Sequence, residues 1–174
     1  PTIGGRMAQL DKTFPTMDCS ICILAPKMIE CYRHPNIRLL TYSELKDVTG
    51  KTGDFKVKIL RKARCVDETK CTGCAACAEH CPVEVPNEFD MELGMRKAIY
   101  MPMPQAVPRA MTVDKNNCIE CGLCQKVCKA GAVDLKQQPQ DIELNVGSII
   151  IATGFNQFNP VSIKEYGYKL YPNV

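Results

Sequence analysis

Two features of membrane and secreted proteins are missing from this sequence of 174 residues. No run of residues approaches the roughly 18 to 20 consecutive apolar residues that a helix needs to cross a bilayer. No positively charged segment followed by an apolar one opens the chain, as it would in a secretion signal. These absences predict a soluble, cytoplasmic protein without a transmembrane segment.

Concentrated positive charge is missing as well. The 22 basic and 19 acidic residues are mixed along the chain and leave a net charge of +3. A nucleic-acid-binding surface usually needs a basic block or stripe, so we expect no nucleic-acid partner. The only two histidines, His34 and His80, have no neighbouring group that would make a catalytic pair. No catalytic acid, base or nucleophile is therefore assigned.

Cysteine, in contrast, is abundant, with 12 residues. In a small secreted protein this number would suggest a disulfide scaffold, which is the lesser alternative here. Eight of the cysteines instead form two identical C-x2-C-x2-C-x3-C tetrads, a spacing suited to wrapping around a metal centre in a reducing compartment. The tetrads are Cys71, Cys74, Cys77 and Cys81, and Cys118, Cys121, Cys124 and Cys128.

The tetrads belong to an internal repeat. Val66-Asp67 precedes Cys71 and Val113-Asp114 precedes Cys118, both in the pattern V-D-x3-C. Each copy predicts an apolar strand-like entry, a tight cysteine loop and a short helix that opens at the fourth cysteine. Neither copy has enough apolar surface to fold alone, so we expect a pseudo-twofold pair. Residues 83–112, with four prolines, are interpreted as an elaborated loop between the copies.

The spacing favours two 4Fe-4S clusters. Three thiolates from one C-x2-C-x2-C turn can bind three corners of a cubane, and the fourth cysteine of each run binds the other cluster in two-cluster ferredoxins. Zinc is the alternative metal, but structural zinc sites usually combine two separate C-x2-C pairs. The expected ligands are Cys71, Cys74, Cys77 and Cys128 for cluster I, and Cys118, Cys121, Cys124 and Cys81 for cluster II.

The second tetrad departs from the usual pattern, because Cys128 is followed by Lys129 where Cys81 is followed by Pro82. We hypothesise that Lys129 favours reduction of cluster I and that Glu120, inside the second loop, disfavours reduction of cluster II. The alternative is that both side chains simply point into water.

The flanks of the cysteine region predict regular structure. A helix is expected over Pro26 to His34, and strands over Ile37 to Leu40 and around Phe55, Val57 and Ile59, with Gly50 and Gly53 at a hairpin turn. Ile142 and Leu144 alternate with polar residues. The apolar run from Val146 to Ala152 predicts a buried strand that leads into a small-residue loop, Ala152-Thr153-Gly154.

Several motifs outside the tetrads resemble the A subunit of heterodisulfide reductase. They follow one another in order along essentially the whole chain. They are residues 4–15 (GGRMAQLDKTFP), 18–28 (DCSICILAPKM), 86–90 (PNEFD), 104–108 (PQAVP) and 151–155 (IATGF).

The resemblance implies an α+β chain in which a two-cluster ferredoxin-like domain is inserted into part of an α/β, thioredoxin-reductase-like FAD-binding domain. The implied boundaries are 1–62 and 141–174 for the FAD-binding part and 63–140 for the insertion. The chain starts at Pro1, shortly before Gly4-Gly5, and the strand and G-x-G-x-x-G loop expected before Gly4 are absent. This predicts a piece of a longer protein that holds FAD only weakly alone. The implied FAD contacts are Gly4, Gly5, Arg6, Gln9, Ala152, Thr153 and Gly154.

The function implied by the resemblance is electron transfer in an oxidoreductase complex of methanogenesis. The clusters would pass single electrons between FAD and partner iron-sulfur subunits or ferredoxin, in flavin-based electron bifurcation. A hydrogenase or dehydrogenase would be a further electron donor. One alternative is a stand-alone two-cluster ferredoxin, and another is an assembly or sensing module whose clusters only stabilise the fold.

Four cysteines fall outside the tetrads. Cys19 and Cys22 form a C-x2-C, with Cys31 further on, and three interpretations remain open: ligands of a further cluster, a redox-active dithiol, or buried thiols near the flavin. The last is favoured, because no fourth ligand lies nearby in the sequence. Cys65 is expected to be unliganded. The apolar segment Tyr100 to Pro104 either docks another subunit or, as we favour, covers the clusters and limits water.

Overall fold

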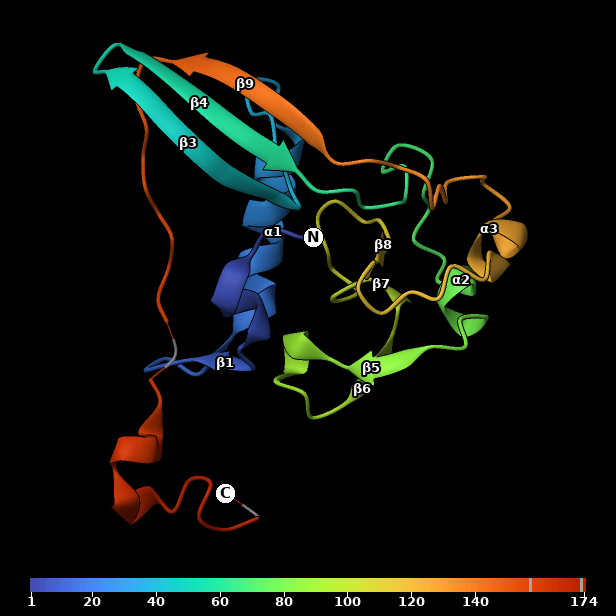
Figure 1. The fold of residues 1–174 in the computed structure, drawn as a ribbon. Helices are drawn as coiled ribbons and strands as arrows, with labels where there is room; N and C mark the ends of the chain where they lie inside the picture. The colour runs from blue at the N-terminus through green and yellow to red at the C-terminus, as the bar shows by residue number, and fades with distance from the viewer. Residues whose placement is uncertain (157, 173) are drawn as a thin grey trace.

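The computed structural model describes residues 1–156, 158–172 and 174 and has a mixed α/β fold (Figure 1). The longest elements are helix α1 (Ser20–Arg33) and strands β3 (Ser43–Lys51), β4 (Asp54–Arg61) and β9 (Gln140–Val146). The short helices are η1 (Gly5–Gln9), α2 (Ala76–Glu79), η2 (Glu88–Asp90), α3 (Leu123–Val127), η3 (Pro160–Ser162) and η4 (Lys164–Tyr166). The short strands are β1 (Lys12–Thr13), β2 (Asp18–Cys19), β5 (Glu84–Pro86), β6 (Met95–Lys97), β7 (Ile99–Tyr100) and β8 (Thr112–Val113).

An antiparallel sheet with the order β3-β4-β9 connects the two flanks of the cysteine region (Figure 1). Ile59 pairs with Ile142 and Val57 with Leu144, so the predicted strand around Phe55, Val57 and Ile59 is confirmed. At one end of the sheet Arg61 pairs with Gln140. The chain therefore leaves the sheet after β4, builds the whole cysteine region, and returns beside the residue from which it left.

Two expected strands are wrong. Residues 37–40 have no strand, and β3 starts only at Ser43. The apolar run after Val146 does not extend β9 either, because Ile150 and Ile151 are 92% and 80% exposed and pair with no strand among the described residues. An extended segment gains its stability from pairing and from burial of one face, and neither is available to these segments here.

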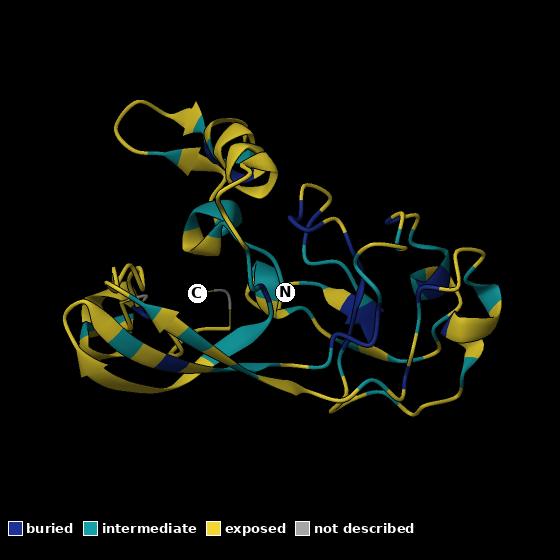
Figure 2. Ribbon diagram, turned by 90° about the horizontal axis from the view of Figure 1, so that it is seen from above, coloured by how far each residue is buried: buried dark blue, intermediate teal, exposed yellow. Residues whose placement is uncertain are grey.

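The core of the cysteine region surrounds the two tetrads. Val66 forms an isolated bridge with Val133, and Val113 pairs with Ile99. The Val-Asp pair that precedes each cysteine loop is therefore joined to another extended segment of the chain. Helices α2 and α3 pack against each other, as expected for a pseudo-twofold pair. The buried residues are concentrated here, as the dark blue ribbon in Figure 2 shows. The core consists of Cys65, Val66, Cys77, Ile99, Met111, Val113, Cys124, Ala132 and Leu135.

A second core joins helix α1 to the segment between the tetrads. Met28 of α1 packs with Met103, Ala106 and Val107, and Met101 contacts both cores. The segment from Tyr100 to Pro104 therefore packs mainly inside the chain. Helix α1 begins at Ser20, six residues before the predicted start, because Cys19 caps it by accepting a hydrogen bond from the backbone N–H of Cys22 at 3.3 Å.

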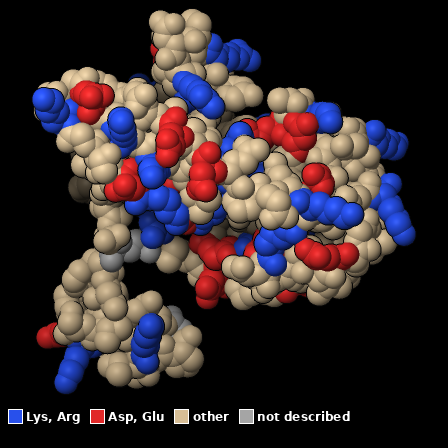
Figure 3. Space-filling view, turned by 45° about the horizontal axis from the view of Figure 1, so that its top comes forward, with Lys and Arg blue, Asp and Glu red and all other residues tan. Residues whose placement is uncertain are grey.

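Charge on the surface is dispersed. In Figure 3 lysines and arginines alternate with aspartates and glutamates across the visible face. Among the described residues, no helix is both long enough and apolar enough to cross a bilayer.

Candidate metal centres

The four cysteines of each predicted ligand set line one cavity. The first cavity, of about 490 Å³, is bordered by Cys71, Cys74 and Cys77 from the first tetrad and by Cys128 from the second. The second, much smaller at about 20 Å³, is bordered by Cys118, Cys121, Cys124 and Cys81. The fold thus brings the cysteines together in the crossed combination that a two-cluster ferredoxin requires.

The cysteines do not converge on a point. No three His, Cys, Asp or Glu side chains of the described part of the chain come close enough to share one metal ion. A zinc ion needs all its sulfurs about 2.3 Å away, whereas each sulfur around a cubane binds a different iron atom. Sulfurs spread around the 490 Å³ of the first cavity fit a cluster, whereas at the second site, with about 20 Å³, the equivalent set of cysteines is what indicates one.

Backbone conformation explains the shape of the ligand loops. The first loop has Gly73 and Ala75 at φ 68° and 64°, and the second has Glu120 and Gly122, 47 positions later, at φ 53° and 75°. Each left-handed residue turns the chain sharply. The second of each pair is the N-cap of α2 or α3, so both helices start before the third cysteine and end before the fourth. The prediction that a helix opens at the fourth cysteine is wrong.

The first cysteine of each loop is held by an aspartate turn. The carbonyl oxygen of Asp67 accepts a hydrogen bond from the N–H of Cys71, and that of Asp114 does the same for Cys118, both at 2.9 Å. The Asp67 carboxylate accepts from Thr69, and the Asp114 carboxylate accepts from the backbone N–H of residue 116. The repeated V-D-x3-C pattern therefore encodes the same turn twice.

Exposure differs among the ligands in the same way in both loops. Cys77 and Cys124 are buried, while Cys74 and Cys121 are exposed. Burial raises the pKa of Cys77 to about 11 and also raises the pKa of Cys124. The backbone N–H of Ala76 lowers the pKa of Cys74. Metal binding must displace the protons of the buried thiols, and the exposed cysteine marks the edge of each site nearest to solvent.

The charges beside the two cavities are not equivalent. Lys129 lines the first cavity. Glu120, in the second loop, is paired with Lys115 at 2.8 Å, and Lys115 also donates to the backbone oxygen of Leu135. The predicted effect of Glu120 on cluster II is therefore weakened by a neighbouring cation that the sequence pattern did not indicate.

A third cavity, of about 780 Å³, lies between residues 1–9, residues 152–156 and the segment between the tetrads. All seven residues that the resemblance implied as FAD contacts line it. Phe89 and Pro102, which sequence reasoning did not select, line it too. The seven are Gly4, Gly5, Arg6, Gln9, Ala152, Thr153 and Gly154. The FAD role of these residues stays a prediction.

Hydrogen bonds fix one wall of this third cavity. Arg6 donates to Gln9 at 3.0 Å, and Gln9 donates to the backbone oxygen of Phe89 at 2.9 Å. On the other side, the backbone N–H of Val107 donates to the hydroxyl of Thr2 at 2.8 Å. The segment between the tetrads is thus bonded directly to the residues around Gly4.

Of the remaining cysteines, Cys19 and Cys22 differ from the favoured expectation. Cys19 and Cys22 form a disulfide, and Cys22 is exposed, so they are not a pair of buried thiols. Proximity across one helical turn at the start of α1 brings them together. Cys31 is free and exposed. Cys65 is fully buried and free, and lies outside both cavities, where burial raises its pKa.

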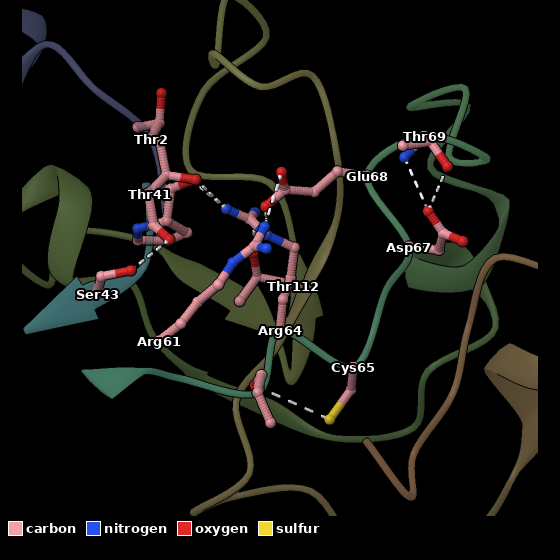
Figure 4. Close-up of polar contacts among 12 residues, drawn as sticks. Thr2, Thr41, Ser43, Arg61, Arg64, Cys65, Asp67, Glu68, Thr69 and Thr112 are labelled. Carbon is pink, nitrogen blue, oxygen red and sulfur yellow. Dashed lines mark hydrogen bonds and ion pairs between the residues drawn. The ribbon is translucent and has the colours of Figure 1, made fainter. Parts of the chain in front are cut away.

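Arg64 connects the cysteine region to the N-terminal part of the chain (Figure 4). Its guanidinium donates to Thr112 Oγ1 at 2.7 Å, to Thr41 Oγ1 at 3.0 Å and to the backbone oxygen of Pro1 at 2.6 Å. Its Nε lies 2.8 Å from a carboxylate oxygen of Glu68. Arg64 is only 3% exposed, so its guanidinium is desolvated, while the Glu68 side chain is 25% exposed.

Comparison with known proteins agrees with the geometry of the tetrads. Residues 70–133, which contain both tetrads, match the family model described as a 4Fe-4S dicluster domain. This match supports iron-sulfur clusters over the zinc and disulfide alternatives.

Curated relatives match the whole chain. The A subunit of the H(2):CoB-CoM heterodisulfide,ferredoxin reductase of Methanothermobacter marburgensis is 57% identical over 100% of this chain and 26% of its own length. An iron-sulfur A subunit of the CoB-CoM heterodisulfide reductase of Methanopyrus kandleri is 61% identical with the same coverage. The A subunit of the Ferredoxin:CoB-CoM heterodisulfide reductase of Methanosarcina mazei is 51% identical over 99% of this chain and 22% of its own length. The chain spans about a quarter of the length of these relatives and is similar to heterodisulfide reductase A subunits from end to end.

Proposed function

We propose that this chain is an electron-transfer segment of a heterodisulfide-reductase-like oxidoreductase, with two 4Fe-4S clusters. The observation that carries the proposal is the crossed arrangement of the eight cysteines around two cavities. Each cavity takes three cysteines from one tetrad and one from the other, so neither site can form without both halves of the repeat. The two sites are therefore linked through the chain itself, which suits passage of electrons from one to the other.

The proposal assigns the third cavity to part of an FAD site. Gly4 and Gly5 have no side chains that would block a pyrophosphate, and the backbone of residues 152–154 faces the same space. FAD, when bound, would supply the step between paired and single electrons. Because the curated relatives are about four times longer, we propose that other parts of the full-length protein complete this FAD-binding domain and cover the exposed apolar residues after Val146, with the cysteine region as its insertion.

The residues of this chain would set the positions of the clusters and their reduction potentials. Met101 and Met103 lie in a groove that reaches from Gly73, in the first ligand loop, toward Pro102, which lines the third cavity. Most of the side chains along this path are apolar and would limit water between the flavin site and cluster I, while Lys97 and Arg109 border it with positive charge.

The partners follow from the family. The names of the relatives include heterodisulfide, hydrogen and ferredoxin, and we propose that the longer protein works in a multi-subunit complex with other heterodisulfide-reductase-like subunits. Ferredoxin or a hydrogenase or dehydrogenase would exchange electrons with it, in flavin-based bifurcation. A stand-alone ferredoxin is not favoured, because a second core and two hydrogen-bonded contacts tie the cysteine region to the rest of the chain.

Iron, sulfide and flavin analysis of the full-length protein, purified without oxygen, tests the proposal. Two cubanes predict about eight iron atoms attributable to this segment, counted as the loss when all eight cysteines are replaced by alanine. A loss of two or fewer would indicate single-ion sites and contradict the proposal. Clusters that never change oxidation state on titration with dithionite would favour a purely structural role.

Gly4→Ala is expected to lower the flavin content of the full-length protein. Gly4 has φ 113°, and a methyl group there would lie 3.0 Å from Met28 Sδ and 3.1 Å from Leu24 Cδ2. The conformation alone costs an L residue about 1–2 kcal/mol, so flavin binding should weaken roughly fivefold to thirtyfold. Flavin absorbance per chain after gel filtration measures the effect.

Gly147→Ala is the matched control, because Gly147 has no atom within 4 Å of an added methyl group and no positive φ. Its flavin content should equal that of the wild type. If Gly4→Ala kept the flavin content of the wild type, Gly4 and helix η1 would not be part of the flavin site.

A further inference from the structure

Arg109 lies on the first ligand loop, although it is distant from both tetrads in the sequence. A methyl group added to Gly73 would lie 3.0 Å from Cγ and 3.2 Å from Nε of Arg109. Gly73 is buried and stands between Cys71 and Cys74. The arginine side chain therefore covers the backbone of the turn that presents these two sulfurs.

The contact between Gly73 and Arg109 depends on a glycine at position 73. Gly73 has φ 68°, a conformation in which glycine is unstrained, and its missing side chain leaves room for the arginine stem. Arg109 and Gly73 also border the groove of about 400 Å³ that runs past Ala75 and Met101. Ala75 lines both this groove and the first cavity, so the two spaces adjoin, and the exposed Arg109 side chain borders the groove.

The second loop has a different arrangement at the equivalent place. By the 47-residue offset of the repeat, Glu120 corresponds to Gly73, and its carboxylate is neutralised by Lys115. Arg109, in contrast, belongs to no ion pair within the described residues, and neither does Lys129. The acidic side chain that acts on Cys74 is Glu79, which opposes only part of this charge. Cluster I therefore has an excess of positive charge beside it and cluster II does not.

We propose that Arg109 positions the first ligand loop and raises the reduction potential of cluster I above that of cluster II. The proposal rests on the proposed function, because it needs a cluster in each cavity. Reduction transfers one electron from the flavin or an iron-sulfur partner to the cluster and adds one negative charge, which a nearby cation stabilises. Cluster I, beside the groove that leads to the third cavity, would then be the first acceptor for an electron from the flavin.

Redox titration of the full-length protein, followed by EPR, tests the role of Arg109. Arg109→Met keeps the stem on Gly73 and removes the charge. In Arg109→Met the midpoint of cluster I should fall by roughly 30–60 mV. At the wild-type midpoint, this shift lowers the ratio of reduced to oxidised cluster about threefold to tenfold. The midpoint of cluster II should not move. The midpoint that also responds to Cys74→Ser identifies cluster I.

Arg109→Lys and Lys51→Met are the controls. Lysine keeps the charge and should retain the wild-type midpoint, and Lys51 lies in the β3–β4 hairpin, where loss of a charge should have no effect. An unchanged cluster I midpoint in Arg109→Met, or an equal shift in Arg109→Lys, would overturn the proposal. Absence of any cluster signal in the wild-type segment would instead refute the proposed function.

Discussion

Cys128→Ala is expected to abolish cluster I, even though Cys128 belongs to the second tetrad. Its sulfur lines the same cavity as Cys71, Cys74 and Cys77, so a cubane there would lose its fourth ligand. The full-length protein should lose about four iron atoms per chain, because a 4Fe-4S cluster needs four protein ligands. Iron and acid-labile sulfide analysis after anaerobic gel filtration measures this loss.

Two double variants decide between crossed and uncrossed ligation. If the ligands cross, Cys71→Ala with Cys128→Ala removes ligands of one cluster only, and the loss should stay near four iron atoms. Cys118→Ala with Cys128→Ala removes one ligand from each cluster, and the loss should be near eight. The opposite result would assign each tetrad to its own cluster. Cys65→Ala is the control, because this buried thiol lines neither cavity, and it should keep all the iron.

The grouping of the cysteines could be predicted from the sequence because ligand spacing is a local property. Three cysteines within seven residues limit how the chain can turn, and the repeat places the fourth in the partner site. The strand containing Val57 and Ile59 was predictable for a similar reason, since alternation within a few residues reports one buried face.

The wrong predictions depend on partners far away in the sequence. Residues 37–40 and 147–152 have strand-like composition, but no described strand pairs with them, and composition does not report pairing. The helices α2 and α3 start where Ala75 and Gly122 adopt left-handed conformations, and an alanine at such a position gives no signal in the sequence. Spacing therefore located the ligands but not the turns that orient them.

Charges beside the clusters could be predicted only in part, since Lys129 follows Cys128 in the sequence and does line the first cavity. Glu120 was a reasonable candidate from its place inside the second loop, but the ion pair with Lys115 neutralises it. Arg109 has no local signal, because it reaches Gly73 through the fold of residues 83–112. Electrostatic tuning depends on distances of a few ångströms across the chain, and those distances follow from packing.

Arg64→Met is expected to destabilise the chain by about 3 kcal/mol. The substitution leaves the Thr112 hydroxyl, which is 0% exposed, without its donor and leaves Glu68 without its buried partner. Removing one member of a buried charged network costs about 3–5 kcal/mol, and partial exposure of Glu68 reduces this cost. For a chain of this size, the apparent melting temperature should fall by roughly 6–12 °C at one fixed scan rate.

Arg61→Met is the matched control, because Arg61 contacts the same carboxylate at 3.3 Å with 37% of its side chain exposed. An exposed ion pair contributes about 0–1 kcal/mol, so its melting temperature should change by a few degrees at most. Equal effects of the two variants would show that the network contributes no more than a surface ion pair. A large effect confined to Arg64→Met would mean that the clusters keep their position relative to the N-terminal residues through one buried guanidinium, which joins Thr112 of the cysteine region to Thr41 and the backbone of Pro1.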